Sequence, residues 1–306
     1  MERTAFFINP AAGSGRAAQI WQALKDRYGA EVTAAADHGW VVEAADPRAA
    51  RSCLDRLLRD ASSVERLVVV GGDGSVHLAV NGVLDADAGQ RVALSLVPAG
   101  TGSDLARTLG VPRRPKAALE ALGKSSRRQL DALELSTAEG RRVVAINVLS
   151  LGISGLVDLR VNAQRRRGTL AFLTASVVSV LQYRAQPCRI EVDGQLLYDG
   201  PLYLLAVGNG RYFGKGMKGL PKAVVDDGRA DVLIVPPKPR VELLGLRLPQ
   251  LYLGKHLGAK GLIYTQAHTI RVVPSKGFPP FDLDGETYAA SEGVVKVLGG
   301  AVTWAG

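Results

Sequence analysis

Leu67-Val-Val-Val-Gly-Gly-Asp-Gly-Ser75 and Leu96-Val-Pro-Ala-Gly-Thr-Gly-Ser-Asp-Leu-Ala-Arg107 are the two stretches that decide the fold. Each is an apolar run suited to a β-strand that ends in a glycine-rich turn with one carboxylate and a hydroxyl. Glycines let a ligand approach the backbone, and the helical pattern that follows presents free N–H groups to an anion. The pair predicts two polyphosphate-binding loops at the carboxyl edge of one parallel sheet. A nucleotide-using phosphoryl-transfer enzyme is therefore the leading hypothesis.

The rest of the N-terminal part alternates between strand and helix patterns. We expect strands at residues 4–9, 32–36, 66–70 and 92–97, and helices at 17–28, 47–58, 76–84, 105–109 and 116–122. Such alternation predicts a parallel sheet with crossover helices. Ligands of such sheets bind at the carboxyl ends of the strands.

The pattern changes after about residue 128, where strand-like runs follow one another. They cover residues 128–135, 143–149, 189–192, 202–208, 229–235, 267–273 and 294–297, with helical candidates at 155–163, 169–183 and 241–248. Runs of strands with few helices predict a mainly antiparallel β-sandwich. The expected fold class is α/β, with a parallel nucleotide-binding domain at 1–128 and a β-rich domain at 129–306. The last strand of the chain is left free to return to the first domain.

The composition suits a globular protein with an anionic partner. The 306 residues are 47% apolar and carry a formal net charge of +9, which favours a nucleotide, a nucleic acid or an anionic membrane surface. An ordinary solvated basic face explains the charge equally well. The two cysteines, Cys53 and Cys188, argue against a disulfide framework or a zinc site. No signal peptide is evident, and the apolar stretch 170–181 is shorter than the ~20 residues of a spanning helix. We expect a soluble, cytoplasmic protein.

Several segments together carry a resemblance to a known family. They are Ile8-Asn-Pro-Ala-Ala-Gly13, Gly71-Gly-Asp-Gly-Ser75 with Asn81-Gly82, Pro98–Arg107, Gly208-Asn-Gly-Arg-Tyr-Phe-Gly-Lys-Gly-Met217, Asp226-Asp-Gly-Arg-Ala-Asp231 and Asp284-Gly-Glu286. In this order, and over nearly the whole chain, they resemble the diacylglycerol kinase catalytic family. That family also contains sphingosine and ceramide kinases and soluble bacterial relatives.

The resemblance implies a nucleotide site and two magnesium sites. ATP would be lined by Asn9, Gly72, Asp73, Gly74, Ser75 and Thr101. Asp73 and Asp104 would hold the catalytic Mg²⁺, partly through water. The Asp227 side chain and the backbone carbonyls of Val224 and Arg229 would hold a structural Mg²⁺, as in soluble bacterial members.

The resemblance also implies the catalytic groups of the second domain. Glu286 would be the general base that takes the proton of the acceptor hydroxyl, and Asp284 would assist at the metal. The chemistry agrees, because phosphoryl transfer needs alignment, a divalent cation and a proton acceptor more than covalent help. Magnesium prefers oxygen ligands, which carboxylates supply. Both glycine loops precede residue 128 and Glu286 follows it, so we expect an interdomain cleft.

The chain departs from the family pattern at a few positions. Ser75 stands where Thr is usual and keeps the hydroxyl, and Ser103 stands where Asn is common. His77-Leu78 occupies the place of an Asn-Glu pair, so any role of that glutamate is absent. We interpret His77 as a histidine on the surface of a helix.

The implied function is transfer of the γ-phosphoryl group of ATP to a lipid hydroxyl, with diacylglycerol as the first choice. A sphingoid base, ceramide or another lipid alcohol stays open, as does a non-catalytic lipid- or nucleotide-binding regulator. An NAD or sugar-phosphate kinase would share Gly-Gly-Asp-Gly but would not explain the later segments. No aromatic-basic stacking motif supports a nucleic-acid partner.

The lipid substrate implies a docking surface for a membrane. Arg165-Arg-Arg167 precedes the apolar stretch 170–181, and a basic cluster beside an apolar helix suits an anionic membrane surface. A buried helix with a solvated basic turn is the competing interpretation. We expect peripheral membrane contact, and we leave a homodimer open.

Overall fold

The computed structural model describes residues 3–100, 102–123, 126–163, 169–239, 242 and 248–306. The chain forms two compact units, which are described separately below. The first unit contains Met1–Leu130 and Gly300–Gly306, and the second contains Asp131–Gly299. Two strands, β5 (Arg127–Thr137) and β16 (Gly293–Ala305), run from one unit into the other.

The first unit is built on a parallel sheet, as the sequence predicts. Its strands lie in the order β2 (Val41–Glu43), β1 (Thr4–Ile8), β3 (Arg66–Gly71) and β4 (Ala93–Pro98). All of these pairings are parallel, and the end of β16 adds a further parallel contact between Trp304 and Leu94. Because the strands run in the same direction, the turns after β1, β3 and β4 lie at one edge of the sheet.

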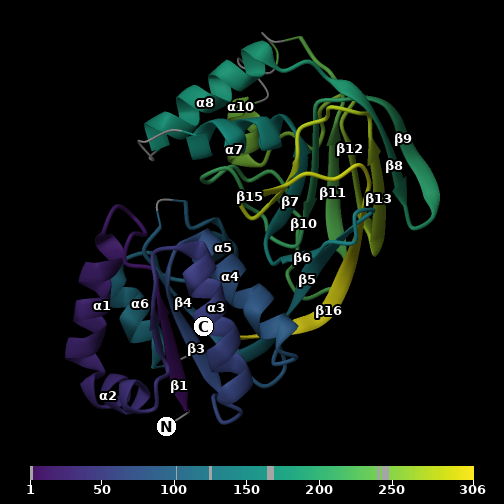
Figure 1. Ribbon diagram of the computed structural model, residues 1–306. Helices are drawn as coiled ribbons and strands as arrows, with labels where there is room; N and C mark the ends of the chain where they lie inside the picture. The colour runs from purple at the N-terminus through teal and green to yellow at the C-terminus, as the bar shows by residue number, and fades with distance from the viewer. Residues whose placement is uncertain (1–2, 101, 124–125, 164–168, 240–241, 243–247) are drawn as a thin grey trace. The chain divides into compact units, whose positions relative to one another are not determined.

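Helices cover both faces of this sheet (Figure 1). α1 (Arg16–Arg27), α2 (Gly29–Asp37) and α6 (Pro115–Leu122) pack apolar residues against β1, β3 and β4 in one core. α3 (Pro47–Asp60) and α4 (Asp73–Asp85) cover the other face, and α5 (Asp104–Leu109) follows the second glycine loop. The sequence sets the start of α3 clearly, because the Asp46 side chain accepts a hydrogen bond from Ala49 N and Pro47 occupies the first turn.

One element of the first unit differs from the prediction. Residues 32–36, expected as a strand, belong to the helix α2, and the second strand comes later as β2. α2 begins at Gly29, just after α1 has ended at Arg27. The segment Val32-Thr-Ala-Ala-Ala36 is rich in alanine, the best helix former, and Val32 and Ala35 bury one side of the helix. The helical spacing therefore outweighs the β-propensity of Val32 and Thr33.

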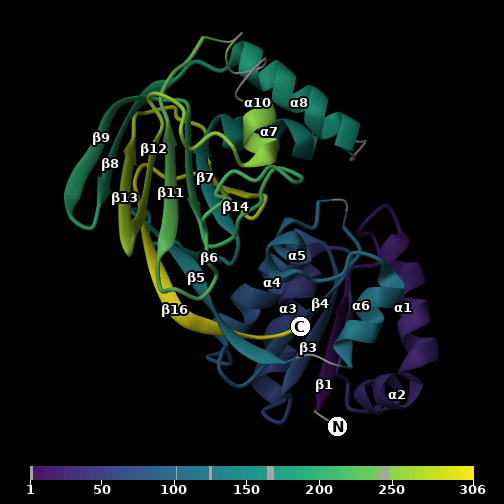
Figure 2. The same ribbon diagram turned by 180° about the vertical axis from the view of Figure 1, so that it is seen from behind.

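The second unit is a β-sandwich, as expected (Figure 2). One layer has the order β12 (Ile263–Ala267), β11 (Ala230–Val235), β10 (Leu204–Gly208), β7 (Val148–Gly152), β14 (Phe281–Leu283) and β15 (Glu286–Tyr288), and all its pairings are antiparallel. The other layer contains β16, β13 (Thr269–Pro274), β8 (Gln186–Val192) and β9 (Gln195–Leu202). β5 and β6 (Arg142–Ala145) join it at β16.

Two apolar clusters stabilise the second unit. Leu149, Leu205 and Ile270 belong to the cluster between the two sheets. The second cluster packs α7 (Ile153–Ala163), α8 (Thr169–Gln182) and α10 (Leu248–Leu253) on the outer face of the β7–β10–β11 sheet. The alternation of apolar residues along β7 and β10 thus serves two cores, one on each face. Of the helix expected at 241–248, residues 241 and 243–247 lie outside the described residues, and α10 begins at Leu248.

Candidate functional site

The two glycine loops of the first unit lie against each other. The backbone N–H groups of Ala99 and Gly100 both donate to the carbonyl of Gly71, at 2.8 and 3.3 Å. A Cβ atom on Gly100 would lie 2.7 Å from the Cα of Gly72, closer than side-chain atoms tolerate. The loops therefore need glycine at this contact, and the parallel pairing of β3 with β4 brings them together.

The turn after β1 joins the same corner. Asn9 N donates to the carbonyl of Val70, and the Asn9 side-chain oxygen accepts from Ala11 N at 3.1 Å and shapes the turn. Gly13 has a φ of +62°, and a Cβ there would lie 2.0 Å from the carbonyl oxygen of Ala99. Three loops that are distant in the sequence therefore meet at the carboxyl edge of this sheet, where α/β proteins bind ligands.

Asp73 and Asp104 lie side by side in this corner. Asp73 is the first residue of α4, and its two carboxylate oxygens accept from Asp104 N and Leu105 N, each at 3.3 Å. The Asp104 side chain is 9% exposed, and its Oδ1 lies 3.7 Å from Nε of Arg107. Two adjacent carboxylates, one of them buried, concentrate negative charge beside two helix N-termini.

These carboxylates fit the magnesium ion that the sequence implies. Mg²⁺ prefers oxygen ligands and often uses one or two carboxylates, with water and phosphate oxygens completing the shell. Burial of the negatively charged Asp104 carboxylate is costly. A bound Mg²⁺ would offset this charge in addition to Arg107. Among the described residues no group of three or more Asp, Glu, His or Cys side chains is placed to hold a metal. The pair Asp73 and Asp104 would therefore rely on water and phosphate ligands.

The remaining nucleotide residues of the prediction lie near these loops. Gly72 and Gly74 flank Asp73 and are partly exposed. Ser75 is only 3% exposed, and its hydroxyl lies so close to Gly71 that a Cβ there would approach the oxygen to 2.3 Å. The buried Ser75 side chain therefore packs against the backbone of the loop at Gly71. Thr101 lies outside the described residues. His77, expected on the helix surface, is buried in α4 at 3% exposure.

In the second unit, Asp284 and Gly285 form the turn of the β14–β15 hairpin. Both have positive φ angles, +55° and +96°, as a tight Asp-Gly hairpin turn requires. The Asp284 carboxylate accepts hydrogen bonds from Ile146 N, Asn147 N and Val148 N at 2.9 to 3.1 Å. The Asp284 carboxylate therefore fastens the turn to the start of β7.

Glu286 follows the turn as the first residue of β15, where it pairs with Leu283. Its side chain is exposed. Within the part of the chain that the structure describes, no side chain or backbone group makes a hydrogen bond or ion pair with the Glu286 carboxylate. The hairpin thus fixes the backbone of Glu286, and its carboxylate is exposed.

Asn147 and Asn209 connect this turn to the segment Gly208–Met217. The carbonyl of Asn147 accepts from Asn209 N and Gly210 N, each at 2.9 Å, and its side chain donates to the carbonyl of Tyr212. The Asn209 side chain donates to the carbonyls of Asp131 and Ile146. Two of the segments that carry the family resemblance are therefore one hydrogen-bonded network.

The turn implied in structural magnesium binding lies between residues 224 and 229. Asp227 is exposed, and its carboxylate oxygens accept from Arg229 N at 3.1 Å and from the Gln266 side chain at 3.3 Å. Gly228 N donates to the buried Asp131 carboxylate at 2.6 Å. The Asp227 carboxylate supplies oxygen atoms, which are the ligands that Mg²⁺ prefers.

Sequence reasoning gave no individual role to several buried polar residues of this unit, although Asn209 and Asp231 lie in segments that carry the resemblance. Asn147, Asn209, Asp131 and Asp231 are all at most 6% exposed. Burial raises the pKa of the Asp231 carboxyl above its usual value. The available signal was the presence of polar residues inside otherwise apolar strand patterns, since buried polar groups need hydrogen-bond partners.

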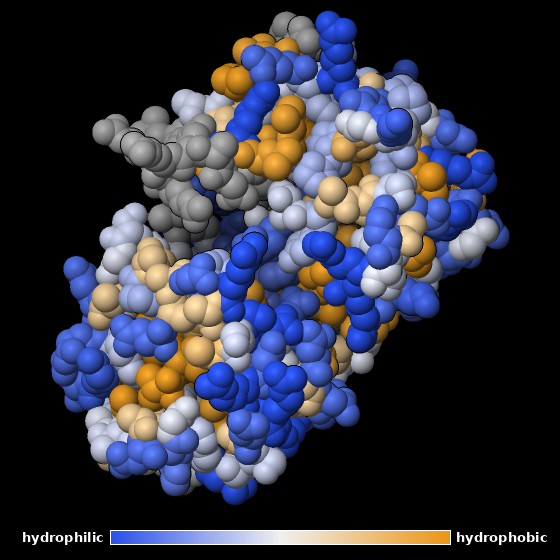
Figure 3. Space-filling view, viewed as in Figure 1, coloured by the Kyte–Doolittle hydropathy of each residue, from blue (hydrophilic) through white to orange (hydrophobic). Residues whose placement is uncertain are grey.

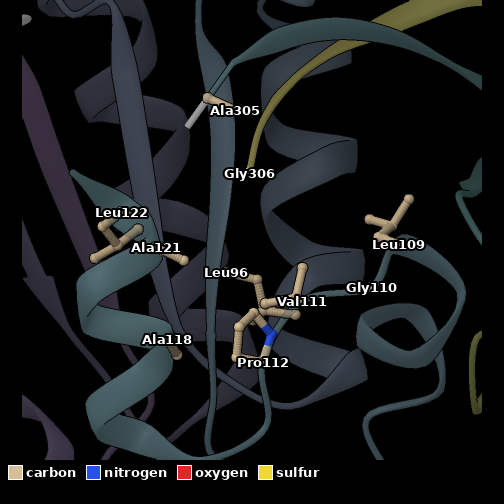
Figure 4. Close-up of a pocket in the computed structure, with 10 residues that line it drawn as sticks. All are labelled: Leu96, Leu109, Gly110, Val111, Pro112, Ala118, Ala121, Leu122, Ala305 and Gly306. Atoms are coloured by element: carbon tan, nitrogen blue, oxygen red, sulfur yellow. The ribbon is translucent and has the colours of Figure 1, made fainter. Parts of the chain in front are cut away.

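A separate pocket of about 270 Å³ lies in the first unit (Figure 4). Its lining is almost entirely apolar and comes from β4, the segment 109–112, α6 and the end of β16: Leu96, Leu109, Gly110, Val111, Pro112, Ala118, Ala121, Leu122, Ala305 and Gly306. None of the nucleotide or metal residues of the prediction lines it. The pocket therefore does not belong to the site formed by the glycine loops.

Comparison with known proteins adds to this geometry. Residues 3–135 match the diacylglycerol kinase catalytic domain, and residues 147–305 match the YegS C-terminal NAD kinase beta sandwich-like domain. A "Probable lipid kinase YegS-like" of Pseudomonas fluorescens is 30% identical over 87% of this chain and 85% of its own length. The chain belongs to the diacylglycerol kinase family of lipid kinases.

Two further proteins illustrate the likeness. The "Diacylglycerol kinase" of Mycobacterium tuberculosis is 30% identical over 69% of this chain and 68% of its own length. A crystal structure of a diacylglycerol kinase from Bacillus anthracis superimposes with a TM-score of 0.71, at 22% identity, over 99% of this chain and 96% of that chain. At this identity the superposition shows a shared fold, which agrees with the parallel sheet and sandwich described above.

Proposed function

We propose that this protein transfers the γ-phosphoryl group of ATP to the hydroxyl of a lipid, with diacylglycerol as the acceptor. The observation that carries the proposal is the corner of the first unit, where Asp73 and Asp104 meet between two glycine loops. The exposed Glu286 carboxylate in the second unit would accept the proton of the lipid hydroxyl. The names of related proteins support a lipid acceptor, and diacylglycerol is the acceptor named for the Mycobacterium tuberculosis relative.

The first unit would hold the nucleotide. The N-terminus of α4, which follows the first glycine loop, would face the phosphates, and the glycines would permit the close approach that they need. Asn9, Gly72, Asp73, Gly74, Ser75 and Thr101 form the proposed site, with Asp73 and Asp104 as metal ligands. A bound Mg²⁺ would offset charge on the phosphates and on the transferred group.

The second unit would bind the acceptor lipid and supply the general base. A γ-phosphoryl group reacts with an alcohol more readily when a positioned carboxylate takes the hydroxyl proton. Glu286 is suited to this role, because its backbone is fixed by the hairpin and its carboxylate is exposed. Asp284 is less suited to the metal-assisting role expected from the resemblance, since its oxygens accept three backbone N–H groups.

An acceptor panel tests the proposed function. The purified protein is incubated with radiolabelled ATP, Mg²⁺ and mixed micelles that each carry one lipid: diacylglycerol, monoacylglycerol, a sphingoid base, ceramide or a polyprenol. We expect labelled phosphate in the diacylglycerol product. Label in another lipid would reassign the acceptor, and label in none of them, with intact ATP binding, would indicate a regulator.

We also propose peripheral contact with an anionic membrane through the helices of the second unit. Five large apolar side chains of α7, α8 and α10 are between 37% and 65% exposed: Leu159, Val178, Leu181, Tyr252 and Leu253. Apolar surface is visible beside hydrophilic residues over these helices (Figure 3). Arg165–Arg167, the basic cluster of the sequence, lie outside the described residues. None of the described helices is both long and apolar enough to cross a bilayer.

Vesicle sedimentation tests this membrane contact with a matched pair of variants. Leu253→Ser removes an apolar side chain of α10 that is 65% exposed, and Leu196→Ser removes one of β9 that is 53% exposed. We expect the first to weaken binding to vesicles with anionic lipid and the second to leave it unchanged. Binding should fall with added salt, because ions screen the attraction within a Debye length. Equal binding to neutral and anionic vesicles would contradict the proposal.

The structural Mg²⁺ proposal concerns Asp227 with the carbonyls of Val224 and Arg229. An ion that binds only the folded state raises its stability. We expect Mg²⁺ to raise the melting temperature of Asp73→Ala, in which the catalytic site is disabled, and to have a smaller effect when Asp227→Asn is added. An equal rise in both proteins would place the stabilising ion elsewhere.

A further inference from the structure

Asp282 makes a connection to the hairpin turn in addition to that of Asp284. It lies on β14, and its Oδ1 accepts a hydrogen bond from Gly285 N at 2.8 Å. Its Oδ2 accepts from the hydroxyl of Ser150, also at 2.8 Å. Ser150 is fully buried on β7 and is the register partner of Asp282. One carboxylate therefore connects the turn to a strand in the middle of the sheet.

A second hairpin of the same unit shows what this connection adds. Asp193 and Gly194 also have positive φ angles, +48° and +82°, in the turn between β8 and β9. Asp193 accepts from two backbone N–H groups of a neighbouring segment, much as Asp284 does. The residue two places earlier is Glu191, which instead pairs with arginines on the surface. The bridge from a side chain to the turn glycine is thus a feature of the β14–β15 hairpin and not of Asp-Gly turns in general.

The position of this bridge is directly beside Glu286. Gly285 N, which Asp282 binds, belongs to the residue that precedes Glu286. Asp284 fixes the turn to residues 146–148, and Asp282 fixes it to Ser150. With two carboxylates engaged in this way, the third acidic residue of Asp282-Leu-Asp-Gly-Glu286 is left without an internal partner among the described residues.

We propose that Asp282, together with Ser150, is a positioning residue that aims Glu286 at the acceptor hydroxyl. This inference rests on the proposed function, in which Glu286 is the base. Positioned groups contribute strongly to catalysis because small displacements of reacting atoms are costly, with ~1 Å corresponding to about 100-fold in rate. Asp282 acts through hydrogen bonds, so its charge is not required.

Substitutions at Asp282 separate a positioning role from a chemical one. Asparagine keeps an oxygen that can accept from Gly285 N, and its amide can donate to the Ser150 hydroxyl. Alanine removes both bonds. We expect Asp282→Ala to lower kcat with diacylglycerol by ~10- to 100-fold at unchanged KM for ATP, and Asp282→Asn to stay within about threefold of the wild type. Asp193→Ala, the matched change in the other hairpin, should leave kcat unchanged.

A double-mutant cycle tests the Ser150 contact. Ser150→Ala should lower kcat less than Asp282→Ala, because Gly285 N keeps its acceptor. The double variant should be no slower than Asp282→Ala alone, because residues that act through one bond are non-additive. Additive losses would show that Ser150 acts separately, which would overturn this part of the inference. A kcat in Asp282→Asn as low as in Asp282→Ala would show that the carboxylate charge itself is needed and would overturn the positioning role.

Amide hydrogen exchange distinguishes failure of this inference from failure of the proposed function. In Asp282→Ala, exchange at Gly285 and Glu286 should become at least about tenfold faster, while exchange in the Asp193 hairpin stays the same. This measurement needs no lipid substrate. Faster exchange in a protein that phosphorylates no lipid would contradict the proposed function alone. Unchanged exchange, or an unchanged kcat in Asp282→Ala, would contradict the inference.

Discussion

The carboxylate of Asp73 accepts a hydrogen bond from the backbone N–H of Asp104, which joins the starts of two helices that follow neighbouring parallel strands. The same residue that we propose as a metal ligand therefore also aligns the two glycine loops. The arrangement explains why the loops occur as a pair, because each supplies an acidic residue at one corner. It also means that substitutions here must separate the loss of a charge from the loss of a hydrogen bond.

The first prediction concerns the charge of Asp73. Asp73→Asn keeps one oxygen that can accept from Asp104 N or Leu105 N, so it loses one of these two hydrogen bonds together with the negative charge that attracts Mg²⁺. We expect turnover to fall by at least about 100-fold, the scale of losing one preorganised electrostatic group, with a melting temperature near that of the wild type. Asp85→Asn, at the other end of α4, breaks an ion pair with Arg51 and should leave turnover unchanged. Near-normal turnover of Asp73→Asn at saturating Mg²⁺ would exclude the metal role.

The second prediction concerns the contact between the glycine loops. A methyl group on Gly100 would lie 2.7 Å from the Cα of Gly72, so one loop must move. We expect Gly100→Ala to weaken ATP binding by ~10-fold or more and to lower the melting temperature. Gly29→Ala is the matched control, because no atom lies within 4 Å of its Cβ position. There we expect no loss of affinity and a stability change within about 1 kcal/mol. Unaltered nucleotide affinity in Gly100→Ala would place the nucleotide away from this contact.

Much of the fold can be predicted from the sequence because local patterns and long-range packing agree. The runs that form β3 and β4 are apolar, and each is followed by a glycine-rich turn and then by a helix. The structure pairs the two strands in parallel. The prediction of a strand at residues 32–36 was wrong because β-propensity is weak evidence in an alanine-rich segment. β16 extends over Gly293–Ala305, far beyond the expected 294–297, and it continues from the second unit into the first at Gly299-Gly300.

The candidate site was predicted less completely, for a physical reason. Asp73 and Asp104 each follow the end of a strand, and the two strands pair in parallel, so the topology alone predicts that the two residues lie close together. The role of Asp282 depends on its register with Ser150, which lies 132 residues away in the sequence. Hydrogen-bond partners of this kind are set by the pairing of strands, and no local pattern reports them. A carboxylate two residues before Asp284 was the only signal available.

The third prediction concerns the acid stability of the second unit. Burial lowers the pKa of His256 below its ordinary value of 6.5, and its Nε2 lies 2.9 Å from the carbonyl of Gly219. Below pH 6.5 the unfolded chain takes up a proton that the folded chain resists, so the free energy of unfolding should fall as pH falls. His256→Gln should reduce this dependence between pH 7 and 5 relative to the wild type. Urea unfolding at several pH values measures it in both proteins, and parallel curves for His256→Gln and the wild type would refute the assignment.

The fourth prediction concerns the proton acceptor. Glu286→Gln keeps the size and one acceptor oxygen but cannot take a proton as a carboxylate does. A positioned general base contributes ~10²–10⁴-fold, so we expect a loss of turnover of that order. ATP affinity should be preserved, because the proposed nucleotide residues all lie in the first unit. Asp199→Asn, which removes another exposed carboxylate of the second unit, should change neither quantity.

Turnover and ATP affinity measured side by side in Glu286→Gln give three distinct results. A loss of turnover alone identifies Glu286 as the base. An equal loss of both would make it a metal ligand or a structural residue, although the exposure of its side chain and its lack of partners among the described residues argue against a structural role. Unchanged turnover would mean that the alcohol needs no base, as a loose, dissociative transition state permits. In that case Asp282, which acts by aiming Glu286, should not affect the rate either, and Asp282→Ala should keep the kcat of the wild type.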